Sequence, residues 1–165
     1  MPLPNIRKKN DEWYTPDYVV KLIVNDLLDN NIKKIFCPAD KKDSAFVRVL
    51  SDFFEVGYSH IDNGFDFLDY DNDFFKDYDL ILTNPPFSLK NEFIDKAIKI
   101  GKPWLFLLPI SVFDSKKRFE LLKNLDLSIF IFNHRINFNN SKNSPFASIF
   151  IGFGLKNSKP FNFLC

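Results

Sequence analysis

The tetrapeptide Asn84-Pro85-Pro86-Phe87 combines residue types that can hold an amino group in place. Two consecutive prolines fix two φ angles and remove two amide donors, so the carbonyls around them stay in position and are not used by a helix. The Asn84 side-chain oxygen and the Pro85 carbonyl can each accept one N–H of an exocyclic purine amine, and Phe87 offers a flat face for stacking. Such acceptors favour a pyramidal nitrogen with a free lone pair and stabilise its developing positive charge.

The same four residues are also compatible with a plain turn that ends a strand, because Asn-Pro and Pro-Pro are common turn dipeptides. Their position favours the functional interpretation. The continuous apolar run at residues 78–83 predicts a buried strand directly before them, and Ser88 is a candidate cap for a helix directly after them. A loop in that place lies at the edge where α/β sheets bind ligands.

The rest of the chain alternates short apolar runs with helical spacing, which predicts a doubly wound α/β sheet. We expect about seven strands, at residues 34–37, 55–59, 65–68, 78–83, 104–108, 127–132 and 147–153. Helices are expected to begin at Thr15-Pro16, Ser44, Ser88 and Ser115. Because ligands bind such sheets at the carboxyl ends of the strands, residues 38–44, 60–66 and 84–88 are the expected site.

Composition limits the function classes. A length of 165 residues indicates one domain, and 45% hydrophobic with 26% charged residues excludes a disordered chain. The net charge of +1 gives no strong overall attraction to nucleic acid or membrane, so any nucleic-acid contact needs local basic patches. The 21 phenylalanines are interpreted as a consequence of genome composition rather than as a binding surface.

The N-terminal segment has no apolar core of a secretory signal, and no apolar run approaches the roughly 18 residues of a membrane span. With only Cys37 and Cys165, no disulfide framework is expected. A cytoplasmic protein without membrane contact is therefore the default expectation. The spacing of Cys and His residues indicates no metal site.

In this setting the motif resembles that of the S-adenosylmethionine-dependent amino-methyltransferases, above all the adenine-N6 DNA methyltransferases of phages and restriction–modification systems. In that family Asp, Asn or Ser, then Pro-Pro and an aromatic residue, follow the fourth strand and hold the flipped target base. The resemblance implies that Asn84, Pro85, Pro86 and Phe87 are catalytic. It also implies a Rossmann-like methyltransferase fold, mostly parallel with an antiparallel last strand, over residues 1–165 as a single catalytic domain.

The resemblance further implies S-adenosylmethionine as cofactor. The family carries Thr-Pro near the start of the domain, matched by Tyr14-Thr15-Pro16, and an acid with an aromatic residue after the third strand, matched by Asp66-Phe67. The loop after the first strand is glycine-free here and is similar to a minority branch in which Asp40 or Asp43 faces the cationic groups of the cofactor. The expected cofactor residues are Tyr14, Thr15, Pro16, Pro38, Asp40, Asp43, Ser44, His60, Asp66 and Phe67.

Three alternatives stay open. The glycine-free loop is also compatible with a non-catalytic, methyltransferase-like binding subunit, and His60 is equally compatible with a plain surface residue. The motif also occurs in RNA base methyltransferases that act on adenine-N6 or guanine-N2, although DNA is the favoured substrate. We expect no separate target-recognition domain, so recognition falls to short loops, a second copy in a homodimer, or a separate specificity subunit. The expected nucleic-acid contacts, each of which can also be a solvated surface residue, are Lys41, Lys42, Arg118, Arg135, Phe138 and Lys142.

Overall fold

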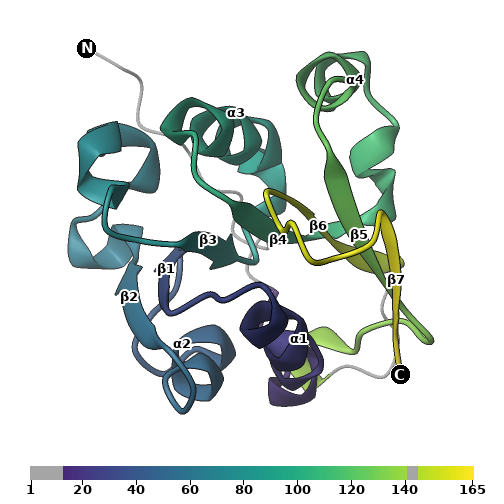
Figure 1. Ribbon diagram of the computed structural model, residues 1–165, viewed down its shortest axis with the longest axis horizontal. Helices are drawn as coiled ribbons and strands as arrows, with labels where there is room; N and C mark the ends of the chain where they lie inside the picture. Colours follow the sequence, from purple (N-terminus) through teal and green to yellow (C-terminus); the bar gives the residue numbers. More distant parts are fainter. Residues whose placement is uncertain (1–12, 141–144) are drawn as a thin grey trace.

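Strands and helices alternate along the chain, and the computed structural model, which describes residues 13–140 and 145–165, arranges them as one sheet with helices on both faces (Figure 1). The strands are β1 (Lys34–Pro38), β2 (Glu55–Ser59), β3 (Leu80–Thr83), β4 (Trp104–Pro109), β5 (Leu127–Phe132), β6 (Ser148–Phe153) and β7 (Phe161–Leu164). The helices are α1 (Asp17–Asp29), α2 (Ala45–Leu50), α3 (Lys90–Ile100) and α4 (Lys116–Leu122). The predicted doubly wound α/β architecture is confirmed.

The strand order β2-β1-β3-β4-β6-β5-β7 places the ligand crevice of the fold. The strands β2, β1, β3 and β4 are parallel to one another, while β6 runs antiparallel to both β4 and β5. The chain leaves β1 toward β2 on one side, and β3 then pairs with the other side of β1. The loops after β1 and β3 therefore diverge, and a crevice opens between them at the carboxyl ends of the strands.

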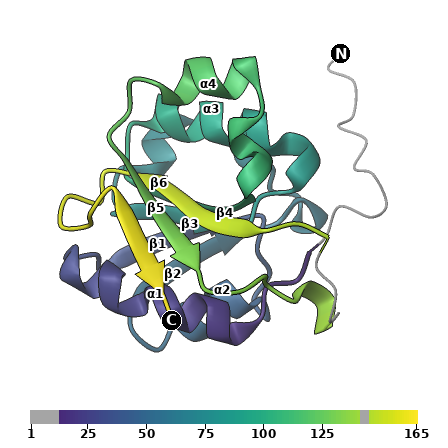
Figure 2. The same cartoon turned by 90° about the vertical axis from the view of Figure 1, so that its right-hand side faces the viewer.

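Two apolar layers hold these strand ends in place. The helices α1 and α2 cover one face of the sheet, and α3 and α4 cover the other (Figure 2). Residues of β4 alternate between the layers, with Leu105 and Leu107 toward α1 and Trp104, Phe106 and Leu108 toward α3. All of β3 and β4 is buried, so the loops that follow them start from fixed points.

Two strand predictions were wrong in part. Residues 65–68 form no strand; instead Phe67–Asp69 is a 3-10 turn, in which the Asp66 carboxylate accepts a hydrogen bond from the Leu68 N–H at 3.0 Å. Aspartate side chains compete with sheet pairing in this way, and seven aspartates lie within residues 62–79. Residues 148–153 do form an antiparallel strand, but it is not the last, because β7 follows and pairs with β5. Only four residues long, β7 gave too little alternation to detect.

The predicted helix caps hold at Ser44 and Ser115, whose hydroxyls accept from the backbone N–H three residues later. The other two predictions fail. Pro16 stands at the cap of α1 without a side-chain hydrogen bond, and a 3-10 turn at Phe87–Leu89 precedes α3, which replaces the start expected at Ser88. Within the described ranges, no helix combines the length and apolar character needed to cross a membrane.

The close approach of β6 to β4 requires glycine at position 152. A Cβ there would lie 2.4 Å from the Trp104 carbonyl oxygen and 2.8 Å from Leu105 Cδ1. Because backbone cannot yield as a side chain can, we expect Gly152→Ala to lower the free energy of unfolding by about 3 kcal/mol, measured by urea denaturation. Gly101→Ala is the control: φ is +73° and no atom of the described residues lies within 4 Å of an added Cβ, so the cost should be only about 1 kcal/mol. Equal losses in the two variants would contradict the crowding argument.

Candidate active site

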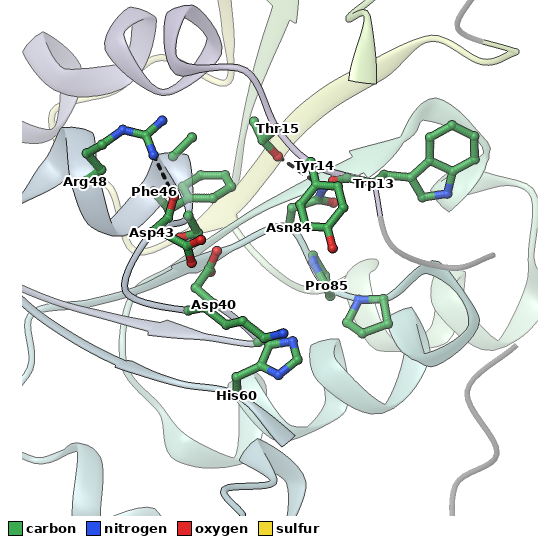
Figure 3. A pocket seen from close by; sticks show the side chains of 15 residues that line it. Trp13, Tyr14, Thr15, Asp40, Asp43, Phe46, Arg48, His60, Asn84 and Pro85 are labelled. Atoms are coloured by element: carbon green, nitrogen blue, oxygen red, sulfur yellow. Dashed lines mark hydrogen bonds between the residues drawn. The ribbon is translucent and has the colours of Figure 1, made fainter. Parts of the chain in front are cut away.

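A cavity of about 340 Å³ opens at the carboxyl ends of β1, β2 and β3 (Figure 3). Four segments meet around it: residues 13–15 before α1, the β1–α2 loop with the start of α2, His60 at the end of β2, and residues 84–86 after β3. These include all three loops that the sheet rule predicted. The sequence positions of the walls are far apart, so the cavity exists only in the folded chain.

The side-chain oxygen of Asn84 is a hydrogen-bond acceptor for which the described part of the chain supplies no donor. Its Nδ2 group donates to the Trp13 carbonyl at 2.8 Å and to Thr15 Oγ1 at 3.2 Å (Figure 3). Its Oδ1 atom is buried and has no hydrogen-bond partner among the described residues. Leaving a buried acceptor unpaired costs about 1–3 kcal/mol, so a ligand that brings an N–H donor to this atom gains that amount. The acceptor role predicted for Asn84 from the sequence is compatible with this unpaired oxygen.

The two prolines and Phe87 divide between the cavity and an aromatic cluster. Pro85 and Pro86 line the cavity, whereas the Phe87 ring stacks on Trp13, with ring centroids 6.1 Å apart and an interplanar angle of 19°. Phe146 meets the edge of the same ring at 5.2 Å, and Phe138 packs against Trp13 at 6.0 Å. We call Trp13, Phe87, Phe138 and Phe146 the aromatic cluster. The stacking face predicted for Phe87 is thus partly covered by Trp13.

Asp40 is a buried carboxyl group on the cavity wall. It is 7% exposed and accepts a hydrogen bond from Thr83 Oγ1 at 2.6 Å. Burial raises the pKa of Asp40 to about 7, although hydrogen bonds from Thr83 and Ser44 act in the opposite direction. The carboxyl group is therefore near half-ionised at neutral pH. A cation bound in the cavity would favour its charged form.

The start of α2 brings charges of both signs to the same wall. Ser44 caps the helix by accepting from the Val47 N–H, and Arg48 follows one turn later. The guanidinium of Arg48 donates to the Asp43 carbonyl at 2.6 Å and pairs with the Asp17 carboxylate at the beginning of α1. This ion pair links α2 to α1 beside the cavity, which Arg48 lines.

His60 is not a plain surface residue. It is 6% exposed, lines the cavity, and its Nδ1 accepts from the Asp62 N–H at 3.1 Å. The Asp62 carboxylate also pairs with Lys41 at 2.7 Å, which draws the loop after β2 toward the loop after β1. The end of β2 is therefore part of the site.

The structure brings six of the ten predicted cofactor residues to the cavity. These six are Tyr14, Thr15, Asp40, Asp43, Ser44 and His60. Pro16 caps α1 and Pro38 is buried as the last residue of β1, so both support the walls without lining them. Asp66 caps its 3-10 turn, and Phe67 is 3% exposed and packed on Phe93 in the core. The core position of Phe67 leaves no face for a ligand.

The residues predicted to contact nucleic acid also fall into two groups, one at the cavity or the surface and one buried in the fold. Lys41 lines the cavity, Lys42 is exposed in the same loop after β1, and Arg135 is exposed in the loop after β5. Arg118 is 9% exposed, and its guanidinium donates to the carbonyls of Val112 and Ser111 and to Asn91 Oδ1. Phe138 is 1% exposed. Arg118 and Phe138 are therefore structural residues, and Lys142 lies outside the described residues.

Three residues of the site were missed from the sequence. Trp13 directly precedes the Tyr14-Thr15-Pro16 match, and an aromatic residue next to a motif is a usable signal. Arg48 lies four positions after the cap Ser44, a spacing that places both on one side of a helix. Thr83 lies at the end of a continuous apolar strand, where a buried polar residue needs a partner, and that partner is Asp40.

Comparison with known proteins identifies a family and two similar proteins. The sequence pattern of the family described as adenine-specific methyltransferase EcoRI matches residues 20–144. The type II methyltransferase M.EcoRI of Escherichia coli is 39% identical over 51 residues, which cover 31% of this chain and 16% of that protein. The chain thus aligns with a small part of that relative's length.

A solved structure shows the same fold. The crystal structure of a protein described as a predicted O-methyltransferase, Atu636 from Agrobacterium tumefaciens, superposes with a TM-score of 0.50. It covers 84% of this chain and 83% of its own length at 12% sequence identity, so the likeness concerns the fold alone. Because the family pattern spans residues 20–144, more than half of the chain and including the loops after β1, β2 and β3, the protein belongs to the adenine-specific methyltransferase EcoRI family.

Proposed function

We propose that the protein transfers a methyl group from S-adenosylmethionine to the N6 amino group of adenine in DNA. The observation that carries this proposal is the buried Asn84 Oδ1, which finds no partner within residues 13–140 and 145–165, beside a cavity that Asp40 and Asp43 also line. An amino group satisfies the first feature and a cation satisfies the second. Membership of an adenine-specific methyltransferase family supports the same reaction.

The residues present fit S-adenosylmethionine. When bound, this cofactor supplies a methyl group on a positively charged sulfur. Asp40 and Asp43 offer carboxylates that offset positive charge, and in their glycine-free loop Ala39 adopts the left-handed φ of +66° that usually favours glycine. The walls formed by Tyr14, Ser44 and His60 complete the proposed cofactor side of the cavity.

The target amine is proposed to reach the Asn84 side after the base leaves the helix stack. Asn84 Oδ1 and the Pro85 carbonyl then accept its two N–H groups, as the rigid Pro-Pro backbone holds both acceptors still. These acceptors stabilise the positive charge that grows on the nitrogen, so positioning supplies the acceleration and no strong base is needed.

Stacking of the base on Phe87 requires the Trp13 ring to move. The two rings are stacked in the structure with centroids 6.1 Å apart, so Trp13 occupies part of the space over the Phe87 face. A turn about the Trp13 side-chain bonds would free the Phe87 face, while the Trp13 carbonyl stays on Asn84. Exposed Lys42 and Arg135 are proposed to contact phosphates, and a second copy or a separate specificity subunit is proposed to supply further contacts.

Product identification tests the proposal directly. The protein is incubated with methyl-labelled S-adenosylmethionine and separate DNA and RNA pools, and the digested nucleosides are identified. We expect N6-methyladenine from DNA. Label in RNA alone would refute the DNA substrate, and no label together with no cofactor binding in calorimetry would refute the enzyme.

Asn84→Ala removes the unpaired acceptor. We expect kcat to fall by about 10²–10³, as for loss of one preset hydrogen-bonding group, because its stabilisation is strongest in the transition state. The dissociation constant of S-adenosylhomocysteine should stay within about twofold, since the cofactor occupies the opposite wall. Asn124→Ala makes the same change at an exposed position before β5 and should have no effect. Near-normal turnover of the Asn84 variant would contradict its role.

The raised pKa of Asp40 predicts a pH dependence of cofactor binding. The carboxyl group is mostly neutral at pH 6 and mostly charged at pH 8, and a cation binds the charged form. We expect the affinity for S-adenosylmethionine to rise about tenfold from pH 6 to pH 8 through this group. Asp40→Asn should remove that rise. Calorimetry on both proteins at pH 6, 7 and 8 measures the difference, and identical pH profiles would contradict the assignment.

The raised pKa of Asp40 also predicts that the stability of the fold decreases as the pH rises, whereas cofactor affinity increases. The pKa of Asp40 is about 7 in the folded protein against 3.8 for an ordinary aspartate, so the folded state binds this proton more tightly. Its contribution to stability is complete below about pH 4 and is lost as the pH rises to about 7. Asp40→Asn should abolish that part of the decline in urea denaturation measured across this window.

Trp13 reports on arrival of the base. The chain has two tryptophans, and Trp104 is fully buried in β4. Addition of DNA with a mismatched adenine, in the presence of S-adenosylhomocysteine, should change the emission of Trp13 because its ring leaves Phe87. Trp13→Phe should abolish the change. A change that persists in this variant would come from Trp104 and would contradict the assignment of the signal to Trp13.

A further inference from the structure

The side-chain amide of Asn84 has two orientations of nearly equal shape, and only one leaves the oxygen available to a ligand. In the structure its Nδ2 group faces two acceptors, the Trp13 carbonyl at 2.8 Å and Thr15 Oγ1 at 3.2 Å. A flipped amide would bring Oδ1 against the Trp13 carbonyl, where neither oxygen has a proton to share. The segment at residues 13–15, which we call the strap, therefore selects the orientation.

The strap is itself held by the loop after β5. The Tyr14 N–H donates to Asn139 Oδ1 at 2.7 Å, and the Asn139 N–H donates to the Tyr14 carbonyl at 3.2 Å. Asn139 has a φ of +53°, a left-handed conformation that asparagine adopts more readily than most residues. This reciprocal pair fixes the backbone of the strap between its two contacts with Asn84.

We propose that the strap is a positioning device for the reaction, in which Thr15 Oγ1 and the Trp13 carbonyl orient Asn84 so that Oδ1 accepts from the target amine. Asn139 acts as the latch that keeps the strap docked. The proposal rests on the proposed function for the identity of the amine. It assigns to Thr15 a role through Asn84, in place of the direct cofactor contact that the sequence resemblance implied.

The two roles of Thr15 predict different kinetics. A cofactor contact acts on binding, whereas an orienting contact acts on the acceptor that is strongest in the transition state. Loss of one neutral hydrogen bond that orients Asn84 should lower kcat by about tenfold without weakening the cofactor.

The first experiment compares Thr15→Val with Thr15→Ser. The valine has the shape of threonine without the acceptor, and the serine keeps the acceptor. We expect kcat to fall about tenfold in Thr15→Val and to recover most of its value in Thr15→Ser. The dissociation constant of S-adenosylhomocysteine should stay within about twofold in both. A rise in that constant as large as the fall in kcat would identify a cofactor contact and overturn the proposal.

A second pair of variants changes Asn139, which is not among the residues that line the cavity. Asn139→Gly keeps the left-handed backbone but removes the acceptor for the Tyr14 N–H, and Asn139→Asp keeps an acceptor there. We expect Asn139→Gly to lower kcat several-fold and Asn139→Asp to retain most of it. Normal turnover in Asn139→Gly would show that no latch is needed.

The orientation can also be observed without activity. The side-chain amide resonance of Asn84 in a ¹⁵N spectrum is identified by its loss in Asn84→Ala, and its hydrogen exchange should be several-fold faster in Thr15→Val than in the unaltered protein. Unchanged exchange would overturn the positioning role. If the unaltered protein methylates no nucleic acid, the proposed function fails, and the exchange measurement still decides whether the strap orients Asn84.

Discussion

The hydrogen bonds from Asn84 Nδ2 to the strap are the interaction on which the site depends. They use both N–H groups of this side-chain amide, and the buried oxygen is left without a partner among the described residues. The Pro-Pro step fixes the backbone on one side, and the latch at Asn139 fixes the strap on the other. An acceptor held from both sides needs little reorganisation when charge appears on the amine, which is the condition for electrostatic stabilisation.

The sheet makes this arrangement possible because it separates the two walls of the cavity. The loop after β1 carries the carboxyl groups and the loop after β3 carries the amide, and the strand order reverses between them. Both strands are buried on both faces by packed aromatic and aliphatic residues, so the distance between the walls is set by the core. Much of the phenylalanine content serves this packing, with Phe36, Phe75, Phe93 and Phe106 in one continuous layer.

The sequence predicted the parts of the site that local patterns determine. Continuous apolar runs located β1, β3 and β4, and the motif at residues 84–87 with the cap at Ser44 located two of the cavity walls. The missed parts depend on contacts between distant residues. Arg118 looked like a basic surface residue, but the fold turns its guanidinium onto the carbonyls of Val112 and Ser111. Likewise the place of Trp13 beside a motif was visible in the sequence, but its stacking on Phe87, 74 positions away, was not.

Two energetically unfavourable groups in the site, on Asn84 and Asp40, indicate one class of ligand. Asn84 Oδ1 is buried without a donor, and Asp40 is buried with a pKa of about 7, so both groups raise the free energy of the folded chain. Replacing them by apolar residues would relieve that cost, which makes them poor choices for stability alone. A bound amine relieves the first and a bound cation relieves the second. Because Asn84 and Asp40 line one cavity, an amino group bound at the first and a positively charged donor bound at the second would lie side by side, as methyl transfer requires.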